Sequence, residues 1–235
     1  MSSPRYALIV DIVRSREIAD RAAAQAAVHG AFARAHDVVP LAEPLWATVG
    51  DEFQAVARTL PAALWTATVA RLLLPDGLDL RVGIGRGETR DVARDGTGPA
   101  IKDGSAWWAA RDAIDEAHRR SDRKESPWVR TWYLDAPRGR DAGTRDAGTQ
   151  GDGRQDAGDA AQVALVDAQL LVLDRMIDSM TSPQRAYAGA SALGRTQAQV
   201  AAAHDVTQPA VSQGLRRSGG AALVAALALL EEVAG

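Results

Sequence analysis

The stretch that decides the fold is YALIVDIV at residues 6–13, an apolar run rich in β-branched side chains. A short run of this kind is typical of a strand buried on both faces. Its one charged residue is Asp11, near the end of the run. We therefore expect a buried strand that carries a carboxylate out of the core at its end.

Helix and strand patterns alternate on the C-terminal side of this strand, up to residue 137. After Asp20, apolar residues recur every three or four positions, which indicates a helix capped by that aspartate. The same kinds of pattern indicate further strands at 45–49, 53–57, 78–84 and 128–134, and further helices at 61–75 and 105–120. The order β-α-β-β-α-β-α-β predicts a ferredoxin-like or palm-type α/β sandwich over residues 1–137.

Composition excludes several classes of protein. With 46% hydrophobic and 24% charged residues, the chain is ordinary for a globular protein, and no apolar run reaches the roughly 18 residues of a membrane span. The N-terminus lacks the pattern of a signal peptide, and zero cysteines exclude disulfides and thiolate metal sites. We expect a cytoplasmic protein with no membrane partner. Because the net charge is −3, binding to DNA requires a local basic patch.

Residues 138–160 divide the chain. This stretch repeats the pentad Arg-Asp-Ala-Gly-Thr at 140–144 and 145–149, and it contains no Ile, Leu, Val or aromatic residue. Such a segment cannot bury enough apolar surface to offset the entropy lost on ordering. We interpret it as a flexible tether whose two flanks, 1–137 and 161–235, move independently.

Three acidic residues of the N-terminal module are candidates for a metal site. Asp11 ends the first strand, and Asp51 and Glu52 lie in the hairpin that begins at Gly50. If the strand lies beside the hairpin, these carboxylates come close together, and hard oxygen ligands suit Mg²⁺. An alternative is that Asp11 only caps a turn and that Gly50-Asp51 is chosen for its backbone geometry.

The segment after the first strand offers groups that bind phosphate. Arg14, Ser15 and Arg16 lie between the strand and the next helix, where backbone N–H groups and guanidinium groups can reach an anion. With a metal held by the acidic residues, this arrangement could bind a nucleoside triphosphate.

Three segments in order resemble the motifs of class III nucleotidyl cyclases. They are Ile9–Ser15, Val49–Phe53 and Leu80–Glu88, and the second is also similar to the motif of GGDEF diguanylate cyclases, with Val49 in place of its first glycine. The whole layout more closely resembles the SatD-type family, which joins such a domain to a C-terminal helix-turn-helix. The resemblance implies that Asp11 and Asp51 are metal ligands, assisted by the Ile12 carbonyl, in a nucleotide site that also includes Glu52.

The sequence also departs from the cyclases. Ala47 stands where they carry an adenine-binding Lys, and the later helix has no Asn, with Arg111 one position out of register for their transition-state Arg. Phosphoryl transfer depends on positioned positive charge. We therefore expect nucleotide binding, with Arg111 contributing, and not turnover.

Residues 161–235 show only helical patterns. Thr196 and Gln199 form a capping box, residues 204–206 form a turn, and Thr207 caps a second helix over 208–217. This resembles the bacterial helix-turn-helix, with Val206, Val211 and Leu215 in the core. The outward positions predicted to contact DNA are Thr207, Gln208, Ser212, Gln213, Arg216 and Arg217.

Two interpretations of this module remain open. Residues 195–220 carry three Arg against one Asp, which favours DNA, whereas the whole of 161–235 has a net charge of −1, which also fits a protein-interaction module. The last helix, 221–233, is apolar around most of its circumference, so we expect it to be buried in its own core or in a homodimer.

The sequence as a whole predicts a DNA-binding regulator whose N-terminal domain binds a nucleotide with Mg²⁺. The rival prediction is a DNA-tethered cyclase or phosphoryl transferase.

Overall fold

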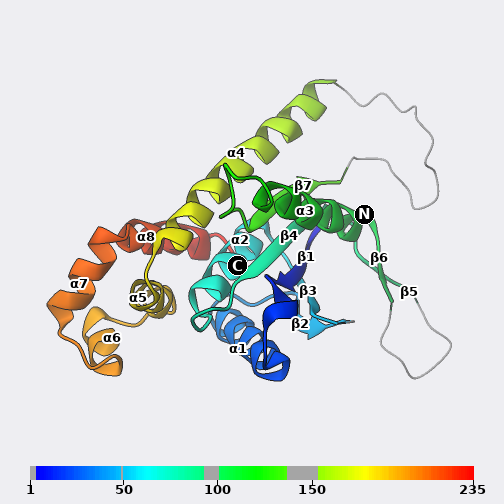
Figure 1. Ribbon diagram of the computed structural model, residues 1–235. Coiled ribbons are helices and arrows are strands. Elements are labelled where there is room, and N and C mark those ends of the chain that lie inside the picture. The colour runs from blue at the N-terminus through cyan, green and yellow to red at the C-terminus, as the bar shows by residue number, and fades with distance from the viewer. Residues whose placement is uncertain (1–3, 49, 93–100, 137–152) are drawn as a thin grey trace.

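A computed structural model describes residues 4–48, 50–92, 101–136 and 153–235. The N-terminal part is a mixed α/β domain built on one main sheet, and a region of helices follows it (Figure 1). The strands and helices of the N-terminal domain follow the predicted order, with two short strands added before the third helix. These are β5 (Arg90–Val92) and β6 (Ile101–Asp103), which among the described residues form a separate two-stranded sheet.

The main sheet has five strands in the order β2-β3-β1-β4-β7. Their bounds are β1 Arg5–Ile12, β2 Glu43–Ala47, β3 Glu52–Ala57, β4 Leu80–Gly87 and β7 Thr131–Asp135. The predicted buried strand, β1, is the central one; it is antiparallel to β3 and to β4, whereas β7 runs parallel to β4. An apolar run buried on both faces requires this central place.

Helices cover both faces of the sheet. Leu8 and Val10 of β1 share a hydrophobic cluster with α1 (Arg21–Val38) and α2 (Leu60–Leu72). Ala7 and Ile9 point the other way and pack with α3 (Ser105–Ser121). The domain therefore has helices on both faces of its sheet, and the expected mixed α/β architecture is confirmed. The apolar residues on the second face of β1 are covered by α3.

Glycines of β4 allow α3 to lie directly on the sheet. A Cβ placed on Gly83 would be 2.3 Å from the carbonyl oxygen of Ala110, and one on Gly85 would be 2.1 Å from the Ala110 nitrogen. Both distances are far below van der Waals contact. The glycines of the third cyclase-like motif thus have a packing role in this fold.

The helical region consists of five helices among the described residues. They are α4 Gly153–Ser179, α5 Ser182–Ala192, α6 Gln197–Ala203, α7 Gln208–Arg217 and α8 Gly220–Glu232. Because α4 begins at Gly153, the last part of the predicted tether 138–160 is helical; the two pentads lie outside the described residues. None of the helices that the structure describes is long and apolar enough to cross a bilayer.

The helical region packs on the sheet domain. α4 lies along β7, and α8 contacts both α2 and α5. Leu170 of α4 and Leu223 of α8 belong to the same buried cluster as the sheet residues. Independent movement of the two flanks would expose this shared core, so that expectation is wrong. The last helix buries its apolar side within its own chain and leaves Leu229 67% exposed.

Candidate functional site

A cleft of about 790 Å³ lies at the end of β1. Its wall continues from β1 into the turn at Arg14, crosses to the β2–β3 hairpin and reaches the end of α3. Almost every residue predicted for the metal and nucleotide site lines it: Asp11, Ile12, Arg14, Ser15, Arg16, Asp51 and Glu52. Arg111 is the exception. The sequence motifs therefore converge on one cavity.

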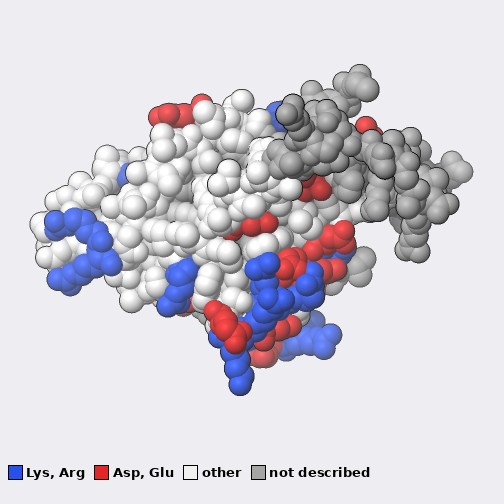
Figure 2. Space-filling view, turned by 90° about the horizontal axis from the view of Figure 1, so that it is seen from above, with Lys and Arg blue, Asp and Glu red and all other residues white. Residues whose placement is uncertain are grey.

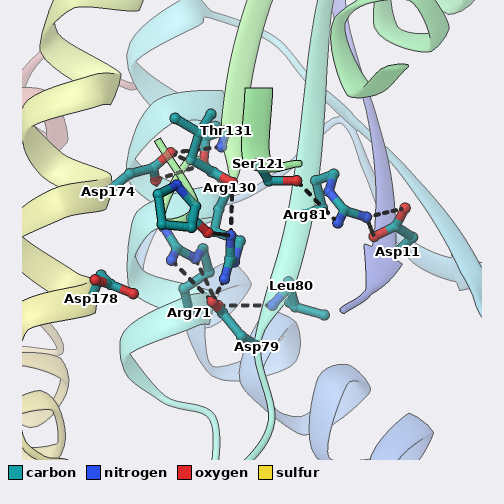
Figure 3. Close-up of polar contacts among 12 residues, drawn as sticks. Asp11, Arg71, Asp79, Leu80, Arg81, Ser121, Arg130, Thr131, Asp174 and Asp178 are labelled. Carbon is teal, nitrogen blue, oxygen red and sulfur yellow. Dashed lines mark hydrogen bonds and ion pairs between the residues drawn. The ribbon is translucent and has the colours of Figure 1, made fainter. Parts of the chain in front are cut away.

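The carboxylate of Asp11 is held by Arg81 of β4. The two residues are directly opposite each other in the β1–β4 ladder, and Nη1 of Arg81 donates to both carboxylate oxygens of Asp11, at 3.0 and 3.2 Å (Figure 3). Burial raises the pKa of Asp11, and the Arg81 charge opposes that shift. The sequence analysis missed Arg81, because its partner is visible only once the register of β4 is known.

Glu52 is paired in the same way with Arg111. Glu52 lies opposite Asp11 in the β1–β3 ladder, and Arg111 of α3 makes two contacts with its carboxylate, at 2.7 and 2.8 Å. Arg111 thus reaches the edge of the predicted site only through Glu52. Across the three strands, the row Glu52–Asp11–Arg81 presents two carboxylates, each paired with an arginine.

The residues at Asp11 do not fit a magnesium site as they stand. Magnesium requires several oxygen ligands in near-octahedral geometry. Both oxygens of Asp11 already accept from Arg81, and among the described residues no group of three or more His, Asp or Glu side chains converges as metal ligands. A guanidinium therefore supplies the positive charge that the resemblance assigns to a metal.

The turn after β1 has an unusual backbone. Arg14 has a φ of 54°, in the left-handed region, and it precedes the short 3-10 helix η1 (Ser15–Glu17). A side chain larger than that of glycine adopts this conformation at a cost of about 1 kcal/mol or more. The Arg14 and Arg16 side chains are exposed beside the cleft. Strain at a residue lining a cavity is consistent with a binding role.

The α6–α7 segment has the geometry that the sequence predicted for each helix. Thr207 caps α7 by accepting from the Ala210 nitrogen, and Asp205 supplies a left-handed turn residue with a φ of 52°. Val211 and Leu215 are buried as expected, whereas Val206 in the turn is 37% exposed, so its predicted place in the core is wrong. The other predicted positions of α7 are exposed or half-buried: Thr207, Gln208, Gln213, Arg216 and Arg217 are exposed, and Ser212 is half-buried. Gln208 also donates to Gln197 of α6, at 2.7 Å.

Charge on this end of the molecule is one-sided. Figure 2 shows basic atoms, and no acidic ones, on the visible face at the end where α6 and α7 lie. Arg216 and Arg217 form the last turn of α7. On that face this end is therefore basic, while Asp205 in the α6–α7 turn is an exposed acidic residue of the same segment.

A buried network of charged residues joins the sheet domain to α4, and the sequence analysis missed it. Arg71 of α2 donates to Asp79 at 3.0 Å and to Asp174 of α4 at 2.5 Å, and Arg130 donates to Asp79 at 2.8 Å (Figure 3). Burial alone would raise the pKa of Asp79, but Arg71 and then Arg130 hold that pKa below its usual value. Asp79 therefore stays ionised between two arginines.

Aspartates of α4 also complete the free edge of β7. Asp174 accepts from the backbone nitrogen of Thr131 at 2.8 Å, and Asp167 accepts from that of Tyr133 at 2.9 Å. Residues seven apart share one helix face, and alternate strand residues share one edge. The two aspartates thus take the place of a neighbouring strand.

Comparisons with known proteins agree with part of this description. A model of the SatD family matches residues 5–128. None of the curated proteins gives a significant match. Among solved structures, the chain is similar to the crystal structure of the guanylyl cyclase Cya2, with 12% sequence identity and a TM-score of 0.33 over 50% of this chain and 68% of that one. The family match spans more than half of the sequence and nearly all of the cleft, so the chain belongs to the SatD family.

Proposed function

We propose that this protein is a DNA-binding transcriptional regulator that reads duplex DNA with α7. The observation that carries the proposal is the form of α7: Val211 and Leu215 are buried, while its outer face is polar and ends in two exposed arginines. A helix of this kind, joined to α6 by a short turn, fits the major groove as a helix-turn-helix does.

The side chains on the outer face divide into two roles. Gln208 and Gln213 can make paired hydrogen bonds to adenine, and Ser212 can donate or accept. Arg216 and Arg217, in the last turn, are suited to phosphate oxygens, which set orientation and affinity but not sequence preference. A two-fold dimer would present two copies of α7 to successive major grooves, about 34 Å apart.

The cleft of the sheet domain would hold the effector of this regulator. A nucleotide is the ligand class that the cleft-lining groups favour, because Arg14 and Arg16 are exposed there and Ser15 begins η1. The Mg²⁺ expected from the sequence is not part of this proposal, because both carboxylate oxygens of Asp11 accept from Arg81.

The rival function is a nucleotidyl cyclase or related phosphoryl transferase, and the convergence of Asp11 and Asp51 on one cleft favours it. Two observations count against it: Ala47 stands where the cyclases carry their adenine-binding Lys, and Arg111 of α3 is paired with Glu52. Incubation with each nucleoside triphosphate and Mg²⁺ or Mn²⁺, followed by mass analysis of products, decides between the two.

DNA binding is tested by selecting sequences from a random duplex library and measuring affinity by fluorescence anisotropy at several salt concentrations. Replacing Arg216 and Arg217 by Ala should weaken binding to every duplex and reduce the salt dependence by about one slope unit per lost phosphate contact. Gln213→Ala should instead change the preferred base at one position by about 1–3 kcal/mol. Arg175→Ala, an exposed arginine on α4, is the control that should leave both unchanged. A folded protein with no salt-sensitive affinity for any duplex would leave α7 as a surface for a protein partner.

A further inference from the structure

A second groove, of about 460 Å³, lies between the sheet domain and the helical region. It shares Val13, Arg14, Glu17 and Arg130 with the cleft at Asp11, so the two cavities are continuous. Its far wall is Arg185 of α5. Residues of both regions thus face the same space in this groove.

Three arginines from separate parts of the fold line this groove. Arg14 comes from the strained turn after β1, Arg130 from the approach to β7, and Arg185 from the second helix of the helical region. The side chains of Arg130 and Arg185 are only 14% and 17% exposed. They are therefore held in place by packing rather than free in solvent.

Their hydrogen bonds leave donors for a ligand. Nε of Arg130 donates to Asp79, and its Nη1 donates to the carbonyls of Pro127 and Val129, at 2.7 and 2.9 Å, which fixes the guanidinium plane. Arg185 has one long contact, of 3.3 Å, with the exposed Asp76.

Among the described residues, two carboxylates, Glu17 and Asp79, line the groove together with three arginines, so its positive charge is only partly offset. Within the described part of the chain no carboxylate contacts the guanidinium of Arg14. Asp79 is already shared between Arg71 and Arg130.

We propose that this groove binds a polyphosphate chain, and that the arginines do so without a divalent metal. The inference rests on the proposed regulator and names the chemistry of its effector. Arginine forks recognise phosphate oxygens through paired, charge-assisted hydrogen bonds. With Arg81 already filling the cation position at Asp11, the phosphates bind at Arg14, Arg130 and Arg185 instead of on a metal.

Binding there bears directly on the helical region. A ligand that contacts Arg14 and Arg185 at once bridges η1 and α5, and Arg130 continues through Asp79 and Arg71 to Asp174 of α4 (Figure 3). Because the ligand contacts residues of both regions at once, it stabilises the folded state in which the two regions share one core.

The test is calorimetric titration of the full chain, in EDTA, with inorganic tripolyphosphate, ATP and GTP. We expect saturable binding of one ligand per chain. Arg14→Gly, which suits the left-handed backbone, and Arg185→Ala should each weaken it about tenfold or more. Arg175→Ala should leave the affinity unchanged, because Arg175 pairs with Asp178 on the outer side of α4. Equal affinities for the three ligands would assign recognition to the phosphate chain alone, and tighter binding of one nucleotide would add a base contact in the adjoining cleft; both support the site.

Three results would overturn the proposal: no binding in EDTA, equal affinities for Arg185→Ala and Arg175→Ala, or binding that requires Mg²⁺ and is lost in Asp11→Asn. Affinity for DNA, measured on the same proteins without ligand, separates this proposal from the function proposed above. If the protein binds tripolyphosphate but no DNA, the proposed regulatory function is refuted and the phosphate site is retained.

Discussion

Arg71 of α2 and Asp174 of α4 are separated by 103 residues in the chain, yet Nη1 of the arginine donates to Oδ1 of the aspartate at 2.5 Å. Their side chains are 1% and 2% exposed. Burial raises the pKa of Asp174, and the charge of Arg71 opposes that shift. This buried pair holds α4 on the sheet domain together with the Leu170 core contact and the hydrogen bond between Asp167 and Tyr133.

Loss of the Asp174 carboxylate should strongly destabilise the fold. Asp174→Ala leaves the Thr131 and Arg130 nitrogens without their acceptor and leaves Arg71 only Asp79. Removing one partner of a buried pair costs about 3–5 kcal/mol, and we expect a loss of that order in the free energy of unfolding measured in urea. Arg175→Ala, which removes an exposed ion pair on the same helix, should cost less than about 1 kcal/mol. Similar losses in the two variants would contradict the anchoring role.

Asp167 should make stability depend on pH. Burial raises its pKa from 3.8 to about 7, against the opposing effect of its hydrogen bond from Tyr133. The folded protein therefore binds the proton more tightly than the unfolded chain, so the Asp167 contribution to stability is greatest below its unfolded pKa and is lost as pH rises through about 7. Asp167→Asn keeps an acceptor for the Tyr133 nitrogen without the charge. Urea titrations across this range should show a flatter pH profile for the variant, and an unchanged profile would refute the shift.

The helical region should not fold when it is expressed alone. In residues 161–235, Leu170 and Leu223 would lose the sheet domain as a partner, and Asp174 would lose all four of its donors. We expect poor dispersion in NMR spectra and no cooperative thermal transition. A cooperative transition in this fragment would show that the shared core is dispensable.

The glycines of β4 provide a test of the packing of α3. Gly85→Ala places a Cβ against the backbone of α3 and should cost at least about 2 kcal/mol, at the upper end of overpacking effects. Gly30→Ala is the matched control, because it lies within α1 with no atom within 4 Å of the new Cβ. At that position the free energy of unfolding should rise by about 0.5–1 kcal/mol, because alanine loses less backbone entropy than glycine when the helix forms. Both changes are read from thermal denaturation.

The sequence was informative where the pattern is local. The apolar run at 6–13, the Asp20 cap and the Thr196 and Thr207 caps each depend on residues within a few positions, and the structure has a strand or helix at each. The convergence of Asp11 and Asp51 was predicted because strand ends and hairpins meet at one edge of a sheet.

The parts that the sequence could not predict depend on register and on distant contacts. Arg81 meets Asp11 only because β4 pairs with β1 in one register, and a shift by one residue would turn its side chain to the other face. The placement of α3 on the second face depends on Gly83 and Gly85, whose spacing is equally compatible with a binding loop. In the sequence, Asp167 and Asp174 have the pattern of solvent-exposed helix residues. Their role is visible only in the structure, where β7 is the edge strand and its backbone nitrogens donate to them.

The capping of β7 by α4 has a consequence for how this chain can change over generations. Asp167 and Asp174 position α4 along β7 through their own hydrogen bonds. The position of α4 therefore does not depend on the number of residues that connect it to β7. Residues 140–149 of this connection are two tandem copies of one pentad. A gain or loss of one copy would lengthen or shorten the connection without moving α4, so selection for the docked fold leaves the length of this segment free to drift.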